Sequence, residues 1–139
     1  MVKVVIDTNV FVSGLLNTSK HCRQIIELLK EEKIKLVISI PILEELIEVL
    51  RRPKFSKVIN EEIIRNIVEL IKYQAIFVYP SKNLDLIKED PQDNRFLEAG
   101  QEGKVDFIIS GDKHLLRIKS FKNILILSPK DFLVKLKSL

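Results

Sequence analysis

Five short apolar runs, separated by longer stretches with helical spacing, constrain the fold of this chain more than any other feature of its sequence. The runs are continuous and rich in β-branched residues, which is typical of strands buried on both faces of a sheet. They span residues 3–6, 35–38, 75–78, 106–109 and 123–127. Between them, apolar residues recur three and four positions apart, which predicts helices. The alternation predicts a three-layer α/β/α sandwich around a mainly parallel, five-stranded sheet.

The length and composition favour one folded unit. Domains usually run to roughly 100–200 residues, so a chain of 139 residues predicts a single domain over residues 1–139. A hydrophobic content of 46%, with only 4 Gly and 5 Pro, excludes the disordered and collagen-like classes. The single cysteine, Cys22, excludes an intramolecular disulfide. No apolar stretch approaches the roughly 20 residues of a membrane span. We therefore expect a soluble, cytoplasmic protein that does not enter a membrane.

The charges are unevenly distributed along the chain. Residues 113–139 hold seven basic residues and one acidic residue, a balance of +6, which leaves residues 1–112 at −2 of the total of +4. Solvated lysines on a helix face would account for this basic quarter. A surface that contacts a phosphate backbone would account for it as well.

Four acidic residues occupy positions from which their side chains could meet. Asp7 directly follows the first apolar run, and Asp112 follows the fourth. Asp93 begins the apolar face of one helical stretch, and Glu45 borders the apolar stripe of another, with Glu44 on the opposite border. In open parallel sheets, ligands bind outside the carboxyl ends of the strands. We therefore expect the carboxylates of Asp7, Glu45, Asp93 and Asp112 to converge on one cleft.

Each of these acids also has a purely structural interpretation. Asp7 could close its strand by accepting hydrogen bonds from the following backbone, and Asp112 could be a helix N-cap. Asp93 could complete a capping box with Asp90, and Glu45 could be a solvated flank. This interpretation predicts scattered acids, whereas the functional one predicts a cluster.

A cluster of carboxylates has a chemical requirement. Like charges held together are costly unless a hard divalent cation lies among them. A site made only of oxygen ligands favours Mg²⁺ or Mn²⁺ over Zn²⁺. Such ions activate water and stabilise the charge that builds on a phosphoryl centre. The acids therefore indicate a metal-dependent phosphodiesterase.

Four motifs, taken in order, resemble those of the PIN domain family. They are Val5-Ile-Asp-Thr-Asn-Val10, the segment 39–53 around Glu45, the segment 90–99 with Asp93, and the segment 105–116 with Asp112. The closing segment 124–133 is similar to the branch that contains toxin components of toxin–antitoxin modules. Each motif is short, but four in this order are specific, and together they cover nearly the whole chain.

The resemblance implies a Mg²⁺- or Mn²⁺-dependent endoribonuclease of the VapC-like kind, which hydrolyses RNA phosphodiester bonds with metal-activated water. By position, the metal ligands or water-positioning carboxylates would be Asp7, Glu45, Asp93 and Asp112. Thr8, Asn9 and Ser110 would support the cleft by hydrogen bonds. Asp90 is typical of this branch, and we interpret it first as a helix cap.

The resemblance also implies partners. Basic residues near the cleft that could hold the RNA backbone are Arg51, Arg52 and Lys113. A cognate antitoxin protein would insert a basic segment into the acidic site, and the chain would form a homodimer. The helix expected over residues 60–73 is apolar nearly all round, which indicates burial, either in such a dimer or in the core of the chain.

Two other functions are compatible with the sequence. One is a catalytically inactive PIN-like module that binds RNA or a partner protein. The other is a metal phosphatase that acts on small substrates, although a haloacid-dehalogenase-like phosphatase needs a second aspartate where this chain has Asn9. No glycine-rich phosphate loop follows the first apolar run, which argues against a Rossmann-type nucleotide-binding protein.

Overall fold

The computed structural model describes residues 1–139, as seven α-helices, two short 3₁₀ helices and six β-strands. The strands are β1 (Lys3–Ile6), β2 (Lys35–Ser39), β3 (Ile76–Val78), β4 (Phe107–Ile109), β5 (Ser120–Phe121) and β6 (Ile124–Leu127). The helices are α1 (Thr8–Leu16), α2 (Lys20–Lys30), α3 (Ile40–Leu50), α4 (Glu61–Gln74), α5 (Asn94–Gly103), α6 (Lys113–Ile118) and α7 (Pro129–Lys137), with 3₁₀ helices at Pro53–Phe55 (η1) and Pro91–Asp93 (η2). None of the helices combines the length and the hydropathy that crossing a membrane requires.

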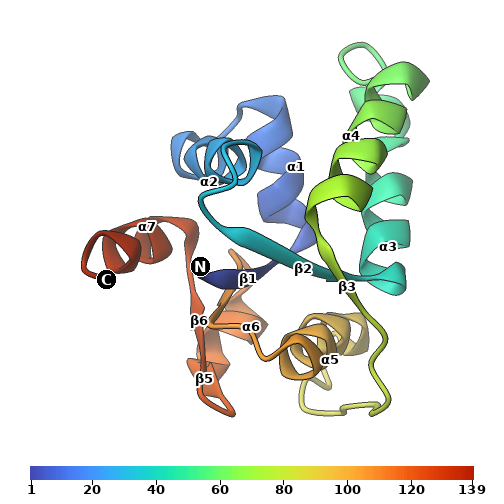
Figure 1. Cartoon of the computed structure of the whole chain (residues 1–139). Coiled ribbons are helices and arrows are strands. Elements are labelled where there is room, and N and C mark those ends of the chain that lie inside the picture. Colours follow the sequence, from blue (N-terminus) through green and yellow to red (C-terminus); the bar gives the residue numbers. More distant parts are fainter.

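All six strands form one sheet in the order β3-β2-β1-β4-β6-β5. Every pairing is parallel except that of β5 with β6. Helices cover both faces: α1 and α2 lie above the sheet in Figure 1 and α5 lies below it. Helix α7 packs against β4 and β6 and also contacts α2, so it belongs to the upper layer. The predicted α/β architecture with a mainly parallel sheet is confirmed.

The predicted number of five strands is wrong, because the sheet has a sixth strand, β5. This strand has two residues, which is too short for any periodicity to reveal it. It pairs with β6 through a two-residue loop in which Lys122 and Asn123 both have positive φ, of 49° and 68°. Positive φ at both loop residues is what a tight type I′ hairpin requires.

The core lies on both sides of the central strands. It is one cluster of 35 buried apolar residues, and Val5 of β1 and Ile108 of β4 have no exposed surface. Phe132 holds α7 against this core through an edge-to-face contact with Phe107, with ring centroids 5.4 Å apart. Helix α4 is less enclosed than its sequence indicates, since only Ile64 and Ile71 are buried in it.

The strand order creates a switch point between β1 and β4. The chain builds β2 and β3 outwards on one side of β1, then crosses to place β4 on the other side. At such a point the connections leave the sheet in opposite directions and open a crevice at the carboxyl ends of the strands. Asp7 follows β1 and Ser110 follows β4, in register with one another because Ile6 pairs with Ile109.

Candidate functional site

Asp7 is buried at the bottom of this crevice, with 4% of its surface exposed. One carboxylate oxygen, Oδ1, caps α1 by accepting the Val10 N–H at 3.1 Å. The other, Oδ2, accepts a hydrogen bond from the buried hydroxyl of Ser110. Burial raises the pKa of Asp7 above its ordinary value, and the hydrogen bond from Ser110 and those from the backbone oppose that rise. The side chain therefore acts as a helix cap and also places a carboxylate at the switch point.

Three further carboxylates, those of Asp90, Asp93 and Asp112, form a cluster that we call the acidic trio. One oxygen from each of Asp90, Asp93 and Asp112 lies within 4.8 Å of the others. The three residues come from η2, its preceding loop and the start of α6, so the fold brings together acids from separate parts of the chain. Asp112 also caps α6, accepting from the N–H groups of His114 at 2.6 Å and Leu115 at 3.4 Å. Its structural and functional interpretations are thus compatible.

Asp93 is the most perturbed member of this acidic trio. Its Oδ2 is buried and has no hydrogen-bond partner. Burial first, and then the neighbouring charges of Asp112 and Asp90, raise the pKa of Asp93 to about 7. A buried carboxylate oxygen without a donor, next to two further carboxylates, fits a divalent cation, which would replace the missing donor and offset the repulsion. The residues present therefore suit Mg²⁺ or Mn²⁺.

The buried side chain of Asn94 holds in place the long connection from β3 to η2, which carries Asp90. Its Oδ1 accepts the N–H groups of Leu86 (3.0 Å) and Ile87 (2.9 Å). Its Nδ2 donates to the carbonyls of Ile87 and Pro91, both at 2.9 Å. Asp90 occupies the N-cap position of η2, as the sequence predicts, but its side chain makes no cap hydrogen bond. Asn94 fixes the loop in the position that places Asp90 beside Asp93 and Asp112.

Glu45, on α3, lies on the other side of the crevice in an ion pair. Its Oε2 accepts a hydrogen bond from the buried hydroxyl of Thr8, and its Oε1 lies 3.0 Å from Nη1 of Arg95. The two charged side chains are largely buried, with 22% of Glu45 and 28% of Arg95 exposed. The structure therefore brings Glu45 to the same crevice as Asp93 and Asp112, but Glu45 is already paired with Arg95.

These groups line one polar pocket of about 480 Å³. Its acidic lining residues are Glu44, Glu45, Glu48, Asp90, Asp93 and Asp112, and its basic ones are Arg52 and Arg95. Thr8 and Asn9 also line it, whereas Asp7 and Ser110 are buried and do not line it. Arg51 and Lys113 do not line it. Arg51 instead forms a two-point pair with Glu61, at 3.1 Å from Nε and 2.9 Å from Nη2.

Four charged lining residues lie outside the predicted set of site residues: Glu44, Glu48, Asp90 and Arg95. Arg95 pairs with an acid fifty positions away, a relation that spacing within one helix cannot show. Glu48 lies opposite the apolar stripe of α3 and is exposed, as a plain surface residue would be, yet it borders the pocket. Glu44 and Asp90 are noticeable in the sequence, at the border of the apolar stripe and in the third motif, but neither is among the predicted ligands.

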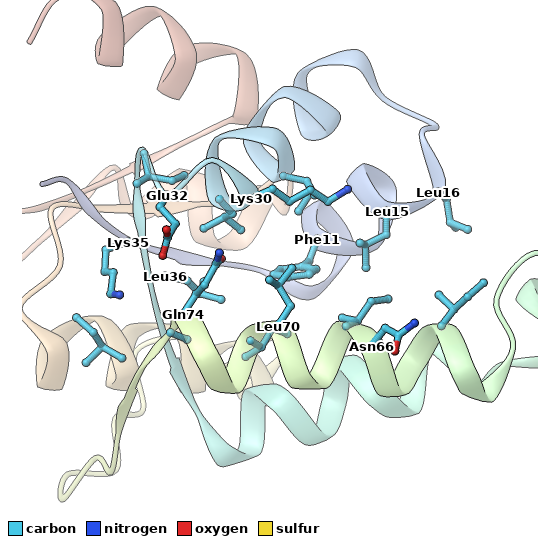
Figure 2. Close-up of a pocket in the computed structure, with 18 of the residues that line it drawn as sticks. Phe11, Leu15, Leu16, Lys30, Glu32, Lys35, Leu36, Asn66, Leu70 and Gln74 are labelled. Atoms are coloured by element: carbon cyan, nitrogen blue, oxygen red, sulfur yellow. The ribbon is translucent and has the colours of Figure 1, made fainter.

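A second, larger cavity has the opposite character. It is an apolar groove of about 800 Å³ between helices α1 and α2 on one side and α4 on the other. Figure 2 shows Phe11, Leu15 and Leu70 along its length, with Lys35 and Gln74 at one end and Leu16 and Asn66 at the other. Several apolar residues on its rim remain exposed, among them Val58 (62%), Ile63 (39%) and Leu70 (39%). Its lining has a single acid, Glu32, so it does not offer the group of carboxylates that the polar pocket has.

Known proteins resemble this chain in sequence and in fold. The uncharacterized protein MJ1680 of Methanocaldococcus jannaschii is 33% identical over 141 residues, which cover 95% of this chain and 90% of that protein. VapBC2 from Rickettsia felis, solved bound to a DNA fragment from its promoter, matches with a TM-score of 0.59 at 14% identity, over 91% of this chain and 98% of that chain. FitAB bound to an IR36 DNA fragment matches with a TM-score of 0.60 at 15% identity, over 91% and 94%. PAE2754 from Pyrobaculum aerophilum matches with a TM-score of 0.60 at 13% identity, over 99% and 91%.

The structural matches have low sequence identity and support the fold, while the family follows from the sequence itself. The sequence model of the PIN domain matches residues 3–114, a span that contains β1 to β4 and every acid of the polar pocket. This chain belongs to the PIN domain family.

Proposed function

We propose that this chain is a metal-dependent endoribonuclease of the cytoplasm, and the toxin of a toxin–antitoxin module. PIN domains are generally nucleases, and the acidic trio at the switch point supports that activity here. The single observation that carries the proposal is the buried, unpartnered Oδ2 of Asp93 beside two further carboxylates. A divalent cation would give that oxygen a partner and would offset the repulsion of the neighbouring carboxylates.

The residues of the pocket divide the work. Asp93 and Asp112, with Asp90 at the rim, would hold a Mg²⁺ or Mn²⁺ ion, and Glu45 would position the water from the opposite wall. The ion, when bound, supplies activation of water and stabilisation of charge on the phosphoryl oxygens. Asp7 does not line the pocket, but it accepts a hydrogen bond from Ser110, which in turn accepts the Asp112 N–H at 2.9 Å. Asp7 would thereby fix the backbone that carries a metal ligand.

The pocket also needs cations for its substrate, because RNA and the acids repel one another. Arg52 lines the pocket and is exposed, so it could contact a phosphate on entry. Lys113 is exposed directly after Asp112, outside the pocket, where a flanking nucleotide would pass. Asn9 lines the pocket beside them and could donate to a sugar or phosphate oxygen.

The test is cleavage of single-stranded RNA by the purified chain with Mg²⁺ or Mn²⁺. We expect cutting that stops on chelation, and a loss of about 10²-fold or more in rate for Asp93→Asn and Asp7→Asn. Retention of the wild-type circular dichroism spectrum by Asp93→Asn would separate chemistry from folding. Equal cutting by Asp93→Asn and the wild type would contradict the proposal. RNA that is bound but never cut would indicate an inactive module, and turnover of a phosphate monoester with RNA untouched would indicate a small-substrate phosphatase.

A partner protein is the second part of the proposal. Two structural neighbours, VapBC2 and FitAB, are complexes that were solved on DNA, which supports an antitoxin partner for this chain. We place the partner's basic segment in the acidic pocket and an apolar helix of the partner in the groove of Figure 2. The groove's exposed apolar rim favours a protein ligand, and Lys30 and Lys35 along it favour an acidic residue on that helix.

Homodimerisation stays a prediction of the family resemblance, which light scattering on the purified chain would test. A mass of one chain, 16.1 kDa, would contradict it.

A further inference from the structure

Arg95 is a largely buried cation inside an acidic pocket, and the chain uses little of its hydrogen-bonding capacity. Its guanidinium makes a single hydrogen bond to the protein, from Nη1 to Oε1 of Glu45 at 3.0 Å. A guanidinium carries five N–H donors in a planar fork. The donors on Nε and Nη2 thus have no acceptor within the chain, and they belong to a side chain that lines the pocket.

Arg51 shows what a guanidinium does when its role is to pair with an acid. It places Nε and Nη2 on the two oxygens of Glu61, at 3.1 and 2.9 Å, which uses the edge that forms two parallel hydrogen bonds. Arg95 instead pairs through Nη1 and leaves that same edge free. Two parallel N–H donors match two oxygens of a phosphate as well as they match a carboxylate.

Glu45 and Thr8 hold Arg95 in one orientation. Its partner Glu45 is held through its other oxygen by the buried hydroxyl of Thr8, at the first residue of α1. The chain Thr8–Glu45–Arg95 therefore ends in a guanidinium whose position is set before any ligand arrives. Pre-ordering of this kind reduces the entropy that binding would otherwise cost.

The position of Arg95 in the pocket indicates which ligand its free Nε and Nη2 donors would bind. Arg95 is two residues after Asp93, and both line the pocket that contains the acidic trio. An anion drawn to a metal on the trio would lie within this same pocket, and a phosphodiester is the anion that the proposed reaction brings there. Glu45 is the one carboxylate of the chain that pairs with Arg95, so the free edge is open to a bound anion.

We propose that Arg95 binds a backbone phosphate of the RNA substrate through Nε and Nη2, and that Thr8 and Glu45 position it. Glu45 thereby has a role that needs no direct contact with metal, in addition to any contact with water. The inference rests on the proposed ribonuclease function, and it names the residue that recognises the substrate's charge.

The test measures RNA binding apart from cutting. Fluorescence anisotropy of a labelled twelve-nucleotide single-stranded RNA, with Ca²⁺ in place of Mg²⁺, gives the Kd at several KCl concentrations. We expect Arg95→Gln to weaken binding about 10-fold or more and to flatten the slope of log Kd against log salt by about 0.7, the value for one phosphate contact on a single strand. Arg95→Lys restores the slope but only part of the affinity, because an ammonium lacks the fork.

Arg23→Gln is the matched control, since it removes the same charge from an exposed residue of α2 outside the pocket and should change the Kd less than 2-fold. Calorimetry with Mn²⁺ separates substrate binding from damage to the metal site. Arg95→Gln should bind Mn²⁺ as tightly as the wild type or more tightly, because a cation has left an acidic pocket. A loss of Mn²⁺ affinity parallel to the loss of RNA affinity would overturn the inference.

The two proposals fail in different ways. If the wild type binds and cuts RNA while Arg95→Gln behaves as Arg23→Gln does, the phosphate contact is refuted and the ribonuclease function stands. If the wild type neither binds nor cuts RNA, the function is refuted and the inference with it.

Discussion

The hydroxyl of Ser110 donates to Oδ2 of Asp7, and so joins the ends of the two strands on either side of the switch point. The hydroxyl oxygen of Ser110 also accepts the N–H of Asp112 at 2.9 Å. One buried side chain therefore links β1, β4 and the start of α6.

Ser110→Ala should destabilise the chain by about 1–3 kcal/mol, because it leaves the Asp7 oxygen and the Asp112 N–H without a partner away from water. Urea unfolding followed by circular dichroism measures this change. Ser81→Ala, at an exposed serine whose hydroxyl makes no hydrogen bond within the chain, is the control. Equal unfolding midpoints for the two variants would show that the link contributes nothing.

Asp93→Asn should stabilise the metal-free chain at high pH but not at low pH. Its folded pKa of about 7 lies above its ordinary value of 3.8, so the folded chain holds a proton that the unfolded chain has released. Stability is therefore lost as the pH rises from about 4 to 7, and Asn removes this loss. In EDTA, we expect the variant's Tm to exceed the wild type's by roughly 2–4 °C at pH 8 and to match it near pH 4. A Tm difference that does not change with pH would contradict the assignment.

Metal binding should displace the proton of Asp93. The affinity for Mn²⁺ should then rise up to about 10-fold per pH unit below pH 7 and level off above it. Asp112→Asn should weaken binding by about 10-fold or more, whereas Asp131→Asn, at an acid in the first turn of α7, should leave it unchanged. Calorimetry in two buffers of different ionisation enthalpy detects the released proton. Binding that is independent of pH would place the ion elsewhere.

Asn94→Ala should cost about 2–3 kcal/mol of stability, since four backbone groups lose their partner and at least one of them is buried. It should also free the segment 79–90 and so increase its rate of cleavage by protease. Asn83→Ala, in the same segment but exposed, controls for sequence changes in the loop. Unchanged proteolysis of Asn94→Ala would show that other contacts hold Asp90 in place.

Leu70→Asp should abolish co-purification with the antitoxin-like product of the neighbouring gene, because it puts a charge into the apolar groove. Leu70 is 39% exposed in the isolated chain, so the folded monomer should tolerate the change. Tyr73→Asp, on the same helix but outside the groove and 84% exposed, is the matched control. If both variants retain the partner, the groove is not its binding surface.

The sequence was sufficient for the parts of this protein that follow from local rules. Buried strands alternate with helices, so the parallel sheet could be predicted, and Asp7 and Asp112 follow strands whose ends meet at one edge. The sixth strand could not be predicted, because Ser120 and Phe121 are strand only through their pairing with β6.

Side-chain partners were the main limit. Spacing places Glu45 at the border of the apolar stripe of α3 but cannot show that Arg95, on α5, lies against it. Asp90 is at the N-cap position that Asp-Pro predicts, but the sequence could not show that its carboxylate lies beside that of Asp112. The pair of Glu45 with Arg95 and the proximity of Asp90 to Asp112 both join segments that are distant in the sequence, so local spacing cannot show them.

The short strand β5 also determines how copies of this chain can associate. A parallel sheet that ended at β6 would offer its unpaired N–H and C=O groups to any passing strand, and could grow into an aggregate. The two residues of β5 cover that edge, and the exposed Lys119 and Lys122 at its ends repel a second copy. At the opposite edge β3 has only three residues. Both edges of the sheet are therefore short, which disfavours growth of the sheet from one copy to the next and favours association through the helices.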